Sequence, residues 1–307
     1  MANVPRSITG ELEINRLSAA LGAEVRGMSL QQIDVAQADT IRSLLHQHKV
    51  LFFPNQFLDI DAHVALGEHF GPLDAHPNLE NPFTQHPQVF ELAASHGGVA
   101  DEWHSDLSFS AEPSVMSILN MIECPDVGGD TMWANTAEAY QALSAPLRDL
   151  CDGLTALHDA TPHGKPEVNA IHPVARVHPD TKQRALFVNE HFTRRIVELS
   201  HEESELLLGY LTRWIAQPRF CVRYHWQQGT IAMWDNRCTQ HFVVGDFSEQ
   251  RIIQRVTVVG DKPEGSEAAR WQPYTRQEVV GATSRYDQQL NDALGRDVQT
   301  LESNRRK

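Results

Sequence analysis

The chain has 307 residues, of which 41% are hydrophobic and 21% are charged, a composition typical of a globular protein with a sizeable buried core. Its formal net charge of −14 argues against nucleic acid or an anionic membrane as the main partner. A small anion in a locally basic pocket stays compatible with this charge. No apolar run approaches the roughly 18–20 residues of a membrane span, so we expect no membrane association.

The cysteines and the first residues indicate the compartment. The stretch MANVPRSITGELEI lacks the apolar core of a signal peptide. Scattered cysteines without a C-x-x-C pair are typical of reduced thiols, not of a disulfide framework or a zinc site. The four are Cys124, Cys151, Cys221 and Cys238. We therefore expect a cytoplasmic protein.

The N-terminal part of the chain predicts short strands and two helices. Residues 8–27 alternate and contain several glycines, which favours a hairpin or two strands. Apolar residues at helical spacing predict a helix over 36–48, with Asp39 as its N-cap. The apolar run 50–53 predicts a buried strand. Residues 59–70 predict a second helix that ends at a Gly-Pro pair.

Residues 74–101 are rich in Pro, Asn, His and Gly around one predicted strand at 88–93. A long irregular stretch of this kind is either a mobile active-site lid or a plain surface loop. The sequence does not decide between the two.

The rest of the chain predicts mainly strands, with helices over 136–151 and 201–215. The predicted strands are 102–109, 114–122, 130–133, 172–178, 184–189, 219–226, 230–234 and 251–259. Because strands and helices do not alternate strictly, a β-sandwich or barrel flanked by helices fits best. We expect one domain over 1–263 and a polar peripheral extension over 264–307, with a helix near 283–295.

The strongest chemical signal is the pair His104 and Asp106. In a strand, residues two apart point to the same face, so an imidazole and a carboxylate would lie side by side. This is two thirds of the 2-His-1-carboxylate triad that holds Fe(II). His241, just past the predicted strand 230–234, is a candidate third ligand. The same donors can hold zinc in a hydrolase, so the pattern alone leaves both readings open.

Two arginines, Arg251 and Arg255, lie four residues apart in one predicted strand and therefore share a face. The planar guanidinium fork binds carboxylates and other oxyanions in a bidentate manner. The pair either clamps anions beside the metal or lies on the surface of an edge strand.

Five segments together resemble the taurine dioxygenase / 2,4-dichlorophenoxyacetate dioxygenase family of Fe(II)- and 2-oxoglutarate-dependent oxygenases. They are WHSD (103–106), GGDTMWAN (128–135), LFVNEHFTRRI (186–196), WDNRCTQH (234–241) and QRIIQRVTVVGDKP (250–263). The resemblance runs in order over about residues 10–263. It implies a double-stranded β-helix (jelly-roll) core, a homo-oligomer (dimer or tetramer), and Fe(II), 2-oxoglutarate and O2 as cofactor and cosubstrates. The implied reaction hydroxylates a small anionic substrate and gives succinate and CO2.

The resemblance also implies roles for single positions. His104, Asp106 and His241 match the iron ligands, and Thr131 and Arg251 match the residues that hold the C5 carboxylate of 2-oxoglutarate. Arg255 and His76 match positions that meet the substrate anion. Leu107 and Phe192 match positions that line the substrate pocket.

Three departures from the taurine enzyme bear on the substrate. Leu79 and Ala100 stand where that enzyme has polar partners, and Ala160 stands where it has a phenylalanine. A buried ammonium needs polar partners, so these changes disfavour taurine. They favour a longer or more apolar sulfonate, an alkyl sulfate or a carboxylate. The alternatives are taurine dioxygenase proper, releasing sulfite and aminoacetaldehyde, a zinc hydrolase, and a binding protein that keeps the fold without catalysis.

Overall fold

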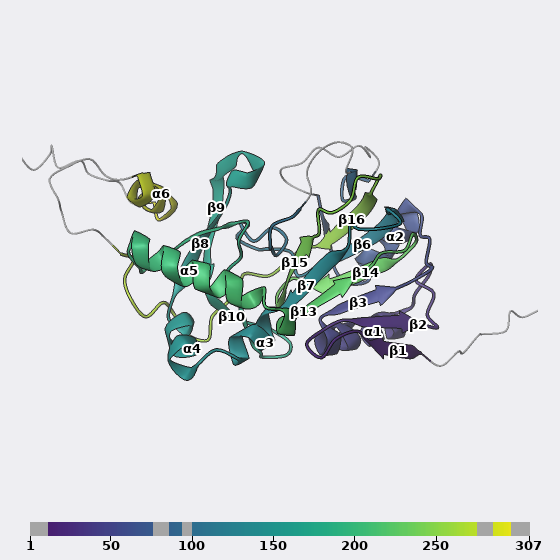
Figure 1. Cartoon of the computed structure of the whole chain (residues 1–307), viewed down its shortest axis with the longest axis horizontal. Coiled ribbons are helices and arrows are strands. Elements are labelled where there is room, and N and C mark those ends of the chain that lie inside the picture. The colour runs from purple at the N-terminus through teal and green to yellow at the C-terminus, as the bar shows by residue number, and fades with distance from the viewer. Residues whose placement is uncertain (1–11, 76–85, 94–99, 275–284, 296–307) are drawn as a thin grey trace, which may run out of the picture. The chain divides into compact units, whose positions relative to one another are not determined.

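The structure is a computed structural model that describes residues 12–75, 86–93, 100–274 and 285–295. The chain forms two compact units (Figure 1). Unit 1 comprises Met1–Asp101, Ser114–Asn135 and Pro218–Gly260, and unit 2 comprises Glu102–Pro113, Thr136–Gln217 and Asp261–Lys307. Within the described ranges, no helix has both the length and the apolar character needed to cross a membrane.

Unit 1 is built on two sheets. The larger has the strand order β1-β2-β3-β14-β6-β16-β4, with β5 also paired to β16, and the smaller has the order β13-β7-β15. All pairings are antiparallel except that of β2 with β3. The strands are β1 (Glu13–Arg16), β2 (Ala23–Arg26), β3 (Val50–Phe53), β4 (Leu73–Asp74), β5 (Phe90–Ala93), β6 (Met116–Glu123), β7 (Thr131–Asn135), β13 (Cys221–Tyr224), β14 (Ile231–Asp235), β15 (Thr239–Val243) and β16 (Ile252–Val258).

The core of unit 1 lies on both faces of the larger sheet. On one face, Phe52 and Trp234 of this sheet pack in one cluster with Trp133 and Tyr224 of the smaller sheet. Phe52 stacks on Tyr224 with 3.8 Å between ring centroids. Two sheets joined by a shared aromatic core form a β-sandwich, which agrees with the predicted jelly roll.

Two helices cover the other face of the larger sheet: α1 (Val35–His48) and α2 (Ile60–Glu68). The helix predicted over 36–48 is confirmed, but its N-cap is Asp34, not Asp39. The Asp34 side chain accepts from the backbone N–H of Gln37, and the Gln37 side chain accepts from the backbone N–H of Asp34. This reciprocal capping box satisfies two backbone N–H groups at the start of the helix, so the helix begins before Asp39.

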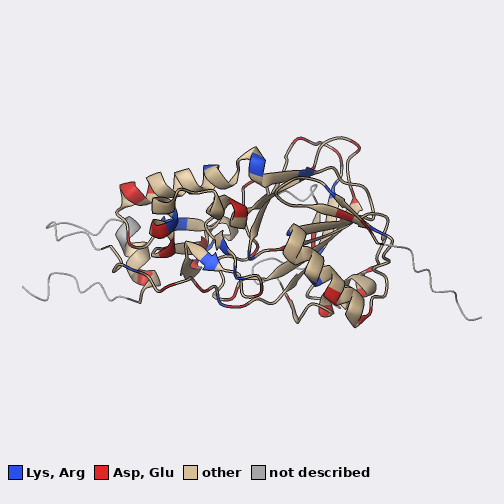
Figure 2. Cartoon of the chain, turned by 90° about the horizontal axis from the view of Figure 1, so that it is seen from below, with Lys and Arg blue, Asp and Glu red and all other residues tan. Residues whose placement is uncertain are grey.

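Unit 2 contains a three-stranded sheet, β12-β8-β9, and a two-stranded sheet, β10-β11. Its elements are α3 (Thr136–Gln141), α4 (Ala145–Asp152), β8 (Thr155–Ala160), β9 (Lys165–Pro173), β10 (Ala175–Val177), β11 (Arg184–Leu186), β12 (Thr193–Ile196), α5 (His201–Ile215) and α6 (Arg285–Ala293). Acidic residues in the first turn of α5 and Arg213 in its last turn complement the helix dipole, and Figure 2 shows the acidic start in red. The predicted helix near 283–295 is confirmed by α6, whose Leu290 packs against Leu157 and Val197.

The segment that carries His104 and Asp106 is not the predicted strand over 102–109. His104 lies in an isolated β-bridge, and a turn follows over residues 106–109, in which the backbone N–H of Ser110 donates to the carbonyl of Leu107 at 2.8 Å. Leu107 adopts φ +55°, the left-handed region that side chains rarely occupy. An extended segment cannot contain this conformation, so the alternation of apolar and polar residues was misleading here.

Buried neutral histidines should make the fold sensitive to acid. Burial lowers the pKa of His63 and of His172 from 6.5 to about 4, and lowers the pKa of His158 well below 6.5. The unfolded chain takes up these protons below pH 6.5 while the folded chain does not. Stability is therefore fully present above about pH 6.5 and falls towards pH 4, by up to about 1.4 kcal/mol per pH unit and per histidine.

We expect His63→Gln to reduce this slope by about one proton, measured by urea unfolding at several pH values between 4 and 7. The His63 Nε2 atom lies 3.1 Å from the carbonyl oxygen of Ile118, and a glutamine amide can donate to the same acceptor. An unchanged slope in this variant would show that His63 does not stay neutral in the folded chain.

Candidate functional site

His104 and Asp106 lie together in unit 2, and both are buried, with 6% and 3% of their surface exposed. The His104 Nδ1 atom lies 2.8 Å from the carbonyl oxygen of Glu102. A carbonyl only accepts, so Nδ1 carries the proton and Nε2 keeps its lone pair. Nε2 lies 3.9 Å from Asp106 Oδ1, too far for a hydrogen bond. The Nε2 lone pair of His104 and the carboxylate of Asp106 are both buried and face each other without a shared proton. Such an arrangement is suited to binding a metal ion between them.

His241 lies in unit 1, on β15, which pairs with β7 so that His241 is opposite Trp133. The side chain is buried, and its ring centroid is 4.8 Å from that of Trp234. Packing against an indole restricts the orientation of the imidazole. Two imidazoles and one carboxylate form the donor set typical of non-haem Fe(II), so the residues fit that metal by their chemistry.

Thr131 and Arg251 lie together in unit 1 and form a buried, hydrogen-bonded pair. Arg251 is 4% exposed; its Nη2 donates to Thr131 Oγ1 at 3.2 Å and its Nε donates to the carbonyl of Gly129 at 3.1 Å. Burial lowers the pKa of Arg251 to about 10. This value is still well above neutral pH, so the guanidinium stays charged there. Among the described residues, no carboxylate forms an ion pair with it. A buried cation with N–H groups to spare calls for an anionic ligand.

Trp226 is a third member of this hydrogen-bonded group, and the sequence did not indicate it. The indole Nε1 of Trp226 donates to Thr131 Oγ1 at 2.9 Å, so the hydroxyl accepts from both Trp226 and Arg251. Its own proton is therefore directed to a further acceptor. Trp226 comes just after β13, and nothing in its sequence context distinguishes it from a core tryptophan.

Arg255 lies on β16 of unit 1, and its guanidinium lies over the ring of Phe90, 5.3 Å from the centroid. The neighbouring Ile253 belongs to the aromatic core cluster, so by alternation Arg255 points to the same face of the sheet. The register shift between β16 and β6 falls at Ile252/Ile253, before Arg255. His76, the predicted partner of Arg255, lies outside the described residues, as does Leu79.

Leu107 and Phe192 lie together in unit 2. They form a buried apolar cluster with Phe109 and Ala160, and the Phe192 ring meets the His104 ring edge-on at 6.2 Å. Ala160 is fully buried, and because its side chain is short, the larger side chains of Leu107, Phe109 and Phe192 provide most of the apolar surface of the cluster. The cluster therefore adjoins His104 in this unit.

Known proteins match this chain over most of its length. Residues 13–257 match the family model described as "Taurine catabolism dioxygenase TauD, TfdA family". The chain belongs to this family. A relative from Pseudomonas putida named alpha-ketoglutarate-dependent sulfate ester dioxygenase is 36% identical, over 86% of this chain and 94% of the relative. A relative from Acinetobacter baylyi named alkylsulfatase is 33% identical, over 84% and 88%.

A solved structure gives the same result for the fold. The crystal structure of a taurine dioxygenase from Burkholderia xenovorans has a TM-score of 0.77 and 37% sequence identity, and the match covers 84% of this chain and 94% of that one. The chain is thus a 2-oxoglutarate-dependent dioxygenase that uses 2-oxoglutarate and O2. The family and fold expected from the five segments are confirmed.

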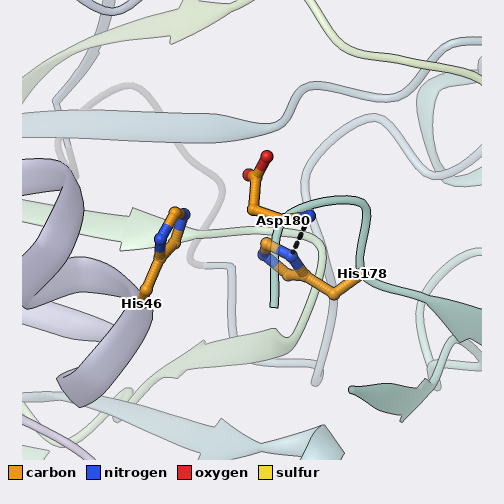
Figure 3. A group of neighbouring side chains, drawn as sticks. All are labelled: His46, His178 and Asp180. Carbon is orange, nitrogen blue, oxygen red and sulfur yellow. Dashed lines mark hydrogen bonds between the residues drawn. The ribbon is translucent and has the colours of Figure 1, made fainter. Parts of the chain in front are cut away.

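One histidine outside the predicted site, His178, closes a turn. His178 follows β10 and its Nδ1 accepts from the backbone N–H groups of Asp180 and Thr181, at 3.1 and 3.2 Å. Figure 3 shows the bond to Asp180, and also draws His46 at the end of α1 in unit 1. A ring nitrogen that accepts two backbone donors closes a turn and is not available to a metal.

Proposed function

We propose that the dioxygenase depends on Fe(II) and oxidises a small anionic substrate at the carbon next to a heteroatom. Alkyl sulfate esters are the substrate class that we favour. The observation that carries the proposal is the buried anchor of Arg251 and Thr131. Its free N–H groups and hydroxyl proton suit the C5 carboxylate of 2-oxoglutarate. A zinc hydrolase has no use for such an anchor.

His104, Asp106 and His241 would hold the metal. Bound Fe(II) supplies the chemistry that couples oxidative decarboxylation of 2-oxoglutarate by O2 to hydroxylation of a substrate C–H bond. The carbonyl of Glu102 keeps the Nε2 lone pair of His104 available, and the buried setting of Asp106 keeps water from competing with it as a ligand.

The substrate side rests on Arg255 and the apolar cluster. Arg255 would bind the substrate anion, together with His76, so that one C–H bond is fixed for reaction. Leu107 and Phe192, with Phe109 and Ala160, would pack against an apolar chain. An alkyl group satisfies this cluster and needs no polar partner, whereas the ammonium of taurine would lack one.

Sulfate esters are favoured by two relatives, which are named for sulfate ester oxidation and for alkyl sulfate cleavage. The proposed reaction consumes one O2 for each alkyl sulfate oxidised. One atom of O2 enters succinate, and the other becomes the hydroxyl on the carbon that bears the sulfate oxygen. That carbon–oxygen bond then breaks, sulfate leaves with the electron pair, and the hydroxyl loses its proton to give an aldehyde.

The proposal is tested with protein reconstituted anaerobically with Fe(II) and then given 2-oxoglutarate, oxygen and a panel of alkyl sulfates, sulfonates and carboxylates. We expect succinate formation to rise most with alkyl sulfates, with release of inorganic sulfate. A stronger response to sulfonates, with sulfite release, would move the substrate to that class. Absence of iron-dependent succinate formation with the whole panel would contradict the proposal.

Arg255→Ala should separate cosubstrate turnover from substrate oxidation. The variant keeps the Arg251 anchor, so slow 2-oxoglutarate turnover without substrate should stay within about threefold of wild type. Coupled turnover should fall about a hundredfold, because a lost charge-assisted contact to a partly buried anion costs about 3 kcal/mol. Gln254→Ala is the matched control, since Gln254 is the next residue on β16 and bonds Glu91 instead. Intact coupling in Arg255→Ala would show that the substrate anion binds elsewhere.

A further inference from the structure

The turn that begins at Asp106 is fixed by buried polar side chains that the proposed reaction does not use. Asp106 is followed at once by Leu107 in the left-handed conformation and then by Ser108, which is 0% exposed. A strained turn persists only when its surroundings determine it. The contacts of Ser108 and Ser110 identify those surroundings.

Ser108 is the centre of this arrangement. Its Oγ accepts from the side-chain amide of Asn189 at 2.9 Å and lies 3.2 Å from Nδ1 of His158 on β8. The same His158 nitrogen lies 3.2 Å from Thr193 Oγ1 on β12. Ser108, His158 and Asn189 are all buried, so water cannot replace a lost partner without cost.

The partners of Ser108 are themselves held. The Asn189 Oδ1 atom accepts from the backbone N–H of Phe192, and the backbone N–H of Asn189 donates to Thr193 Oγ1, both at 2.8 Å. Ser108 Oγ already accepts from Asn189, and its own proton is free to be donated to Nδ1 of His158. This direction requires a neutral His158, which agrees with the lowered pKa of that residue.

A second contact holds the far end of the turn. The Nε2 atom of His172 on β9 lies 2.9 Å from the carbonyl oxygen of Ser110. His172 and His158 pack together, with ring centroids 5.4 Å apart. Residues from β8, β9 and the segment after β11 thus fix both ends of a turn that starts at a ligand carboxylate.

We propose that Ser108, held by His158 and Asn189, is a positioning residue for the metal ligands His104 and Asp106. It sets the path of the chain directly after Asp106 and so fixes where that carboxylate lies relative to Nε2 of His104. The inference rests on the proposed function, because it assumes that these two side chains bind the metal. In this proposal the buried hydrogen bonds of Ser108 position the metal ligands as well as stabilise the fold.

The test compares Ser108→Ala with Ser204→Ala. Ser204 is a matched control, since it is a buried serine of the same unit whose Oγ accepts one backbone N–H, that of Ile196, on a segment without metal ligands. Metal affinity is measured by titration with Mn(II) alone, followed by electron paramagnetic resonance, and stability is measured by urea unfolding. We expect Mn(II) affinity to fall about 10- to 100-fold in Ser108→Ala, which is the range found for residues that orient metal ligands. In Ser204→Ala we expect Mn(II) affinity to stay within about twofold of wild type.

The possible outcomes separate the inference from the proposed function. Equal Mn(II) affinity of Ser108→Ala and wild type, with both variants folded, would overturn the positioning role and leave the metal site standing. Equal losses in both serine variants would also overturn it, because a general loss of stability would then explain the result. A wild-type chain that does not bind Mn(II) would overturn the proposed metal site itself.

Discussion

His104→Ala should abolish Fe(II)-dependent succinate formation, with metal affinity reduced at least about a hundredfold. Loss of residues that only orient a ligand already costs about 10- to 100-fold, so loss of a ligand costs more. The structure adds a reason specific to this chain: the hydrogen bond to Glu102 commits His104 to the tautomer whose Nε2 faces Asp106. The measurement is Mn(II) or Fe(II) titration together with succinate formation.

His201→Ala is the control, because it removes an imidazole from the exposed start of α5 in the same unit. It should leave metal affinity and turnover unchanged. Stoichiometric metal binding and normal succinate formation by His104→Ala would refute the assignment of this histidine as a ligand.

Arg251→Met should raise the KM for 2-oxoglutarate about a hundredfold, with a smaller effect on kcat at saturating cosubstrate. Methionine has a similar length but neither charge nor donors. Loss of one partner of a buried, hydrogen-bonded charge pair costs about 3 kcal/mol, which corresponds to about a hundredfold in affinity. The effect should appear in KM because the C5 carboxylate is remote from the reacting bonds.

Arg42→Met is the matched control for Arg251. Arg42 also lies in unit 1, but its side chain is partly exposed and its charge is paired with the exposed Asp39 one turn earlier on α1. We expect its replacement to change the KM for 2-oxoglutarate by no more than about twofold, in line with the small worth of exposed ion pairs. An equal rise in KM for both variants would point to general electrostatics and not to a specific anchor.

The elements with a clear apolar pattern were predictable. The continuous apolar run 50–53 is β3, and the predicted strands 114–122 and 230–234 correspond to β6 and β14. These segments are buried in the sheet of unit 1, where burial alone dictates their composition. Helices α1 and α5 likewise match their predicted ranges within one residue.

Unit 2 was harder to predict because its core contains polar side chains. No element was predicted for 153–171, where β8 and most of β9 lie. His158 and Asp159 on β8 are fully buried, so the strand lacks the apolar run that signals burial. Their partners, Ser108 and Arg194, are 50 and 35 residues away in the chain, and such pairing cannot be recognised from local sequence.

The site shows the same limit. Spacing alone placed His104 beside Asp106, and the pair does lie together, although His104 is in an isolated β-bridge and Asp106 starts a turn, so no continuous strand carries both. The Arg251–Thr131 anchor joins residues 120 positions apart, and only the family resemblance indicated it. Ser108 carried no signal at all, because a lone serine between Leu107 and Phe109 has nothing in its local sequence that points to a metal site.

The most direct test of the account is to measure succinate and inorganic sulfate together while the Fe(II)-loaded chain acts on a linear alkyl sulfate, with and without oxygen. The account predicts equal amounts of the two products in air, and neither product when O2 or 2-oxoglutarate is left out. Sulfate released without oxygen or 2-oxoglutarate would mean hydrolysis of the ester, and would contradict the oxygenase mechanism proposed for this site.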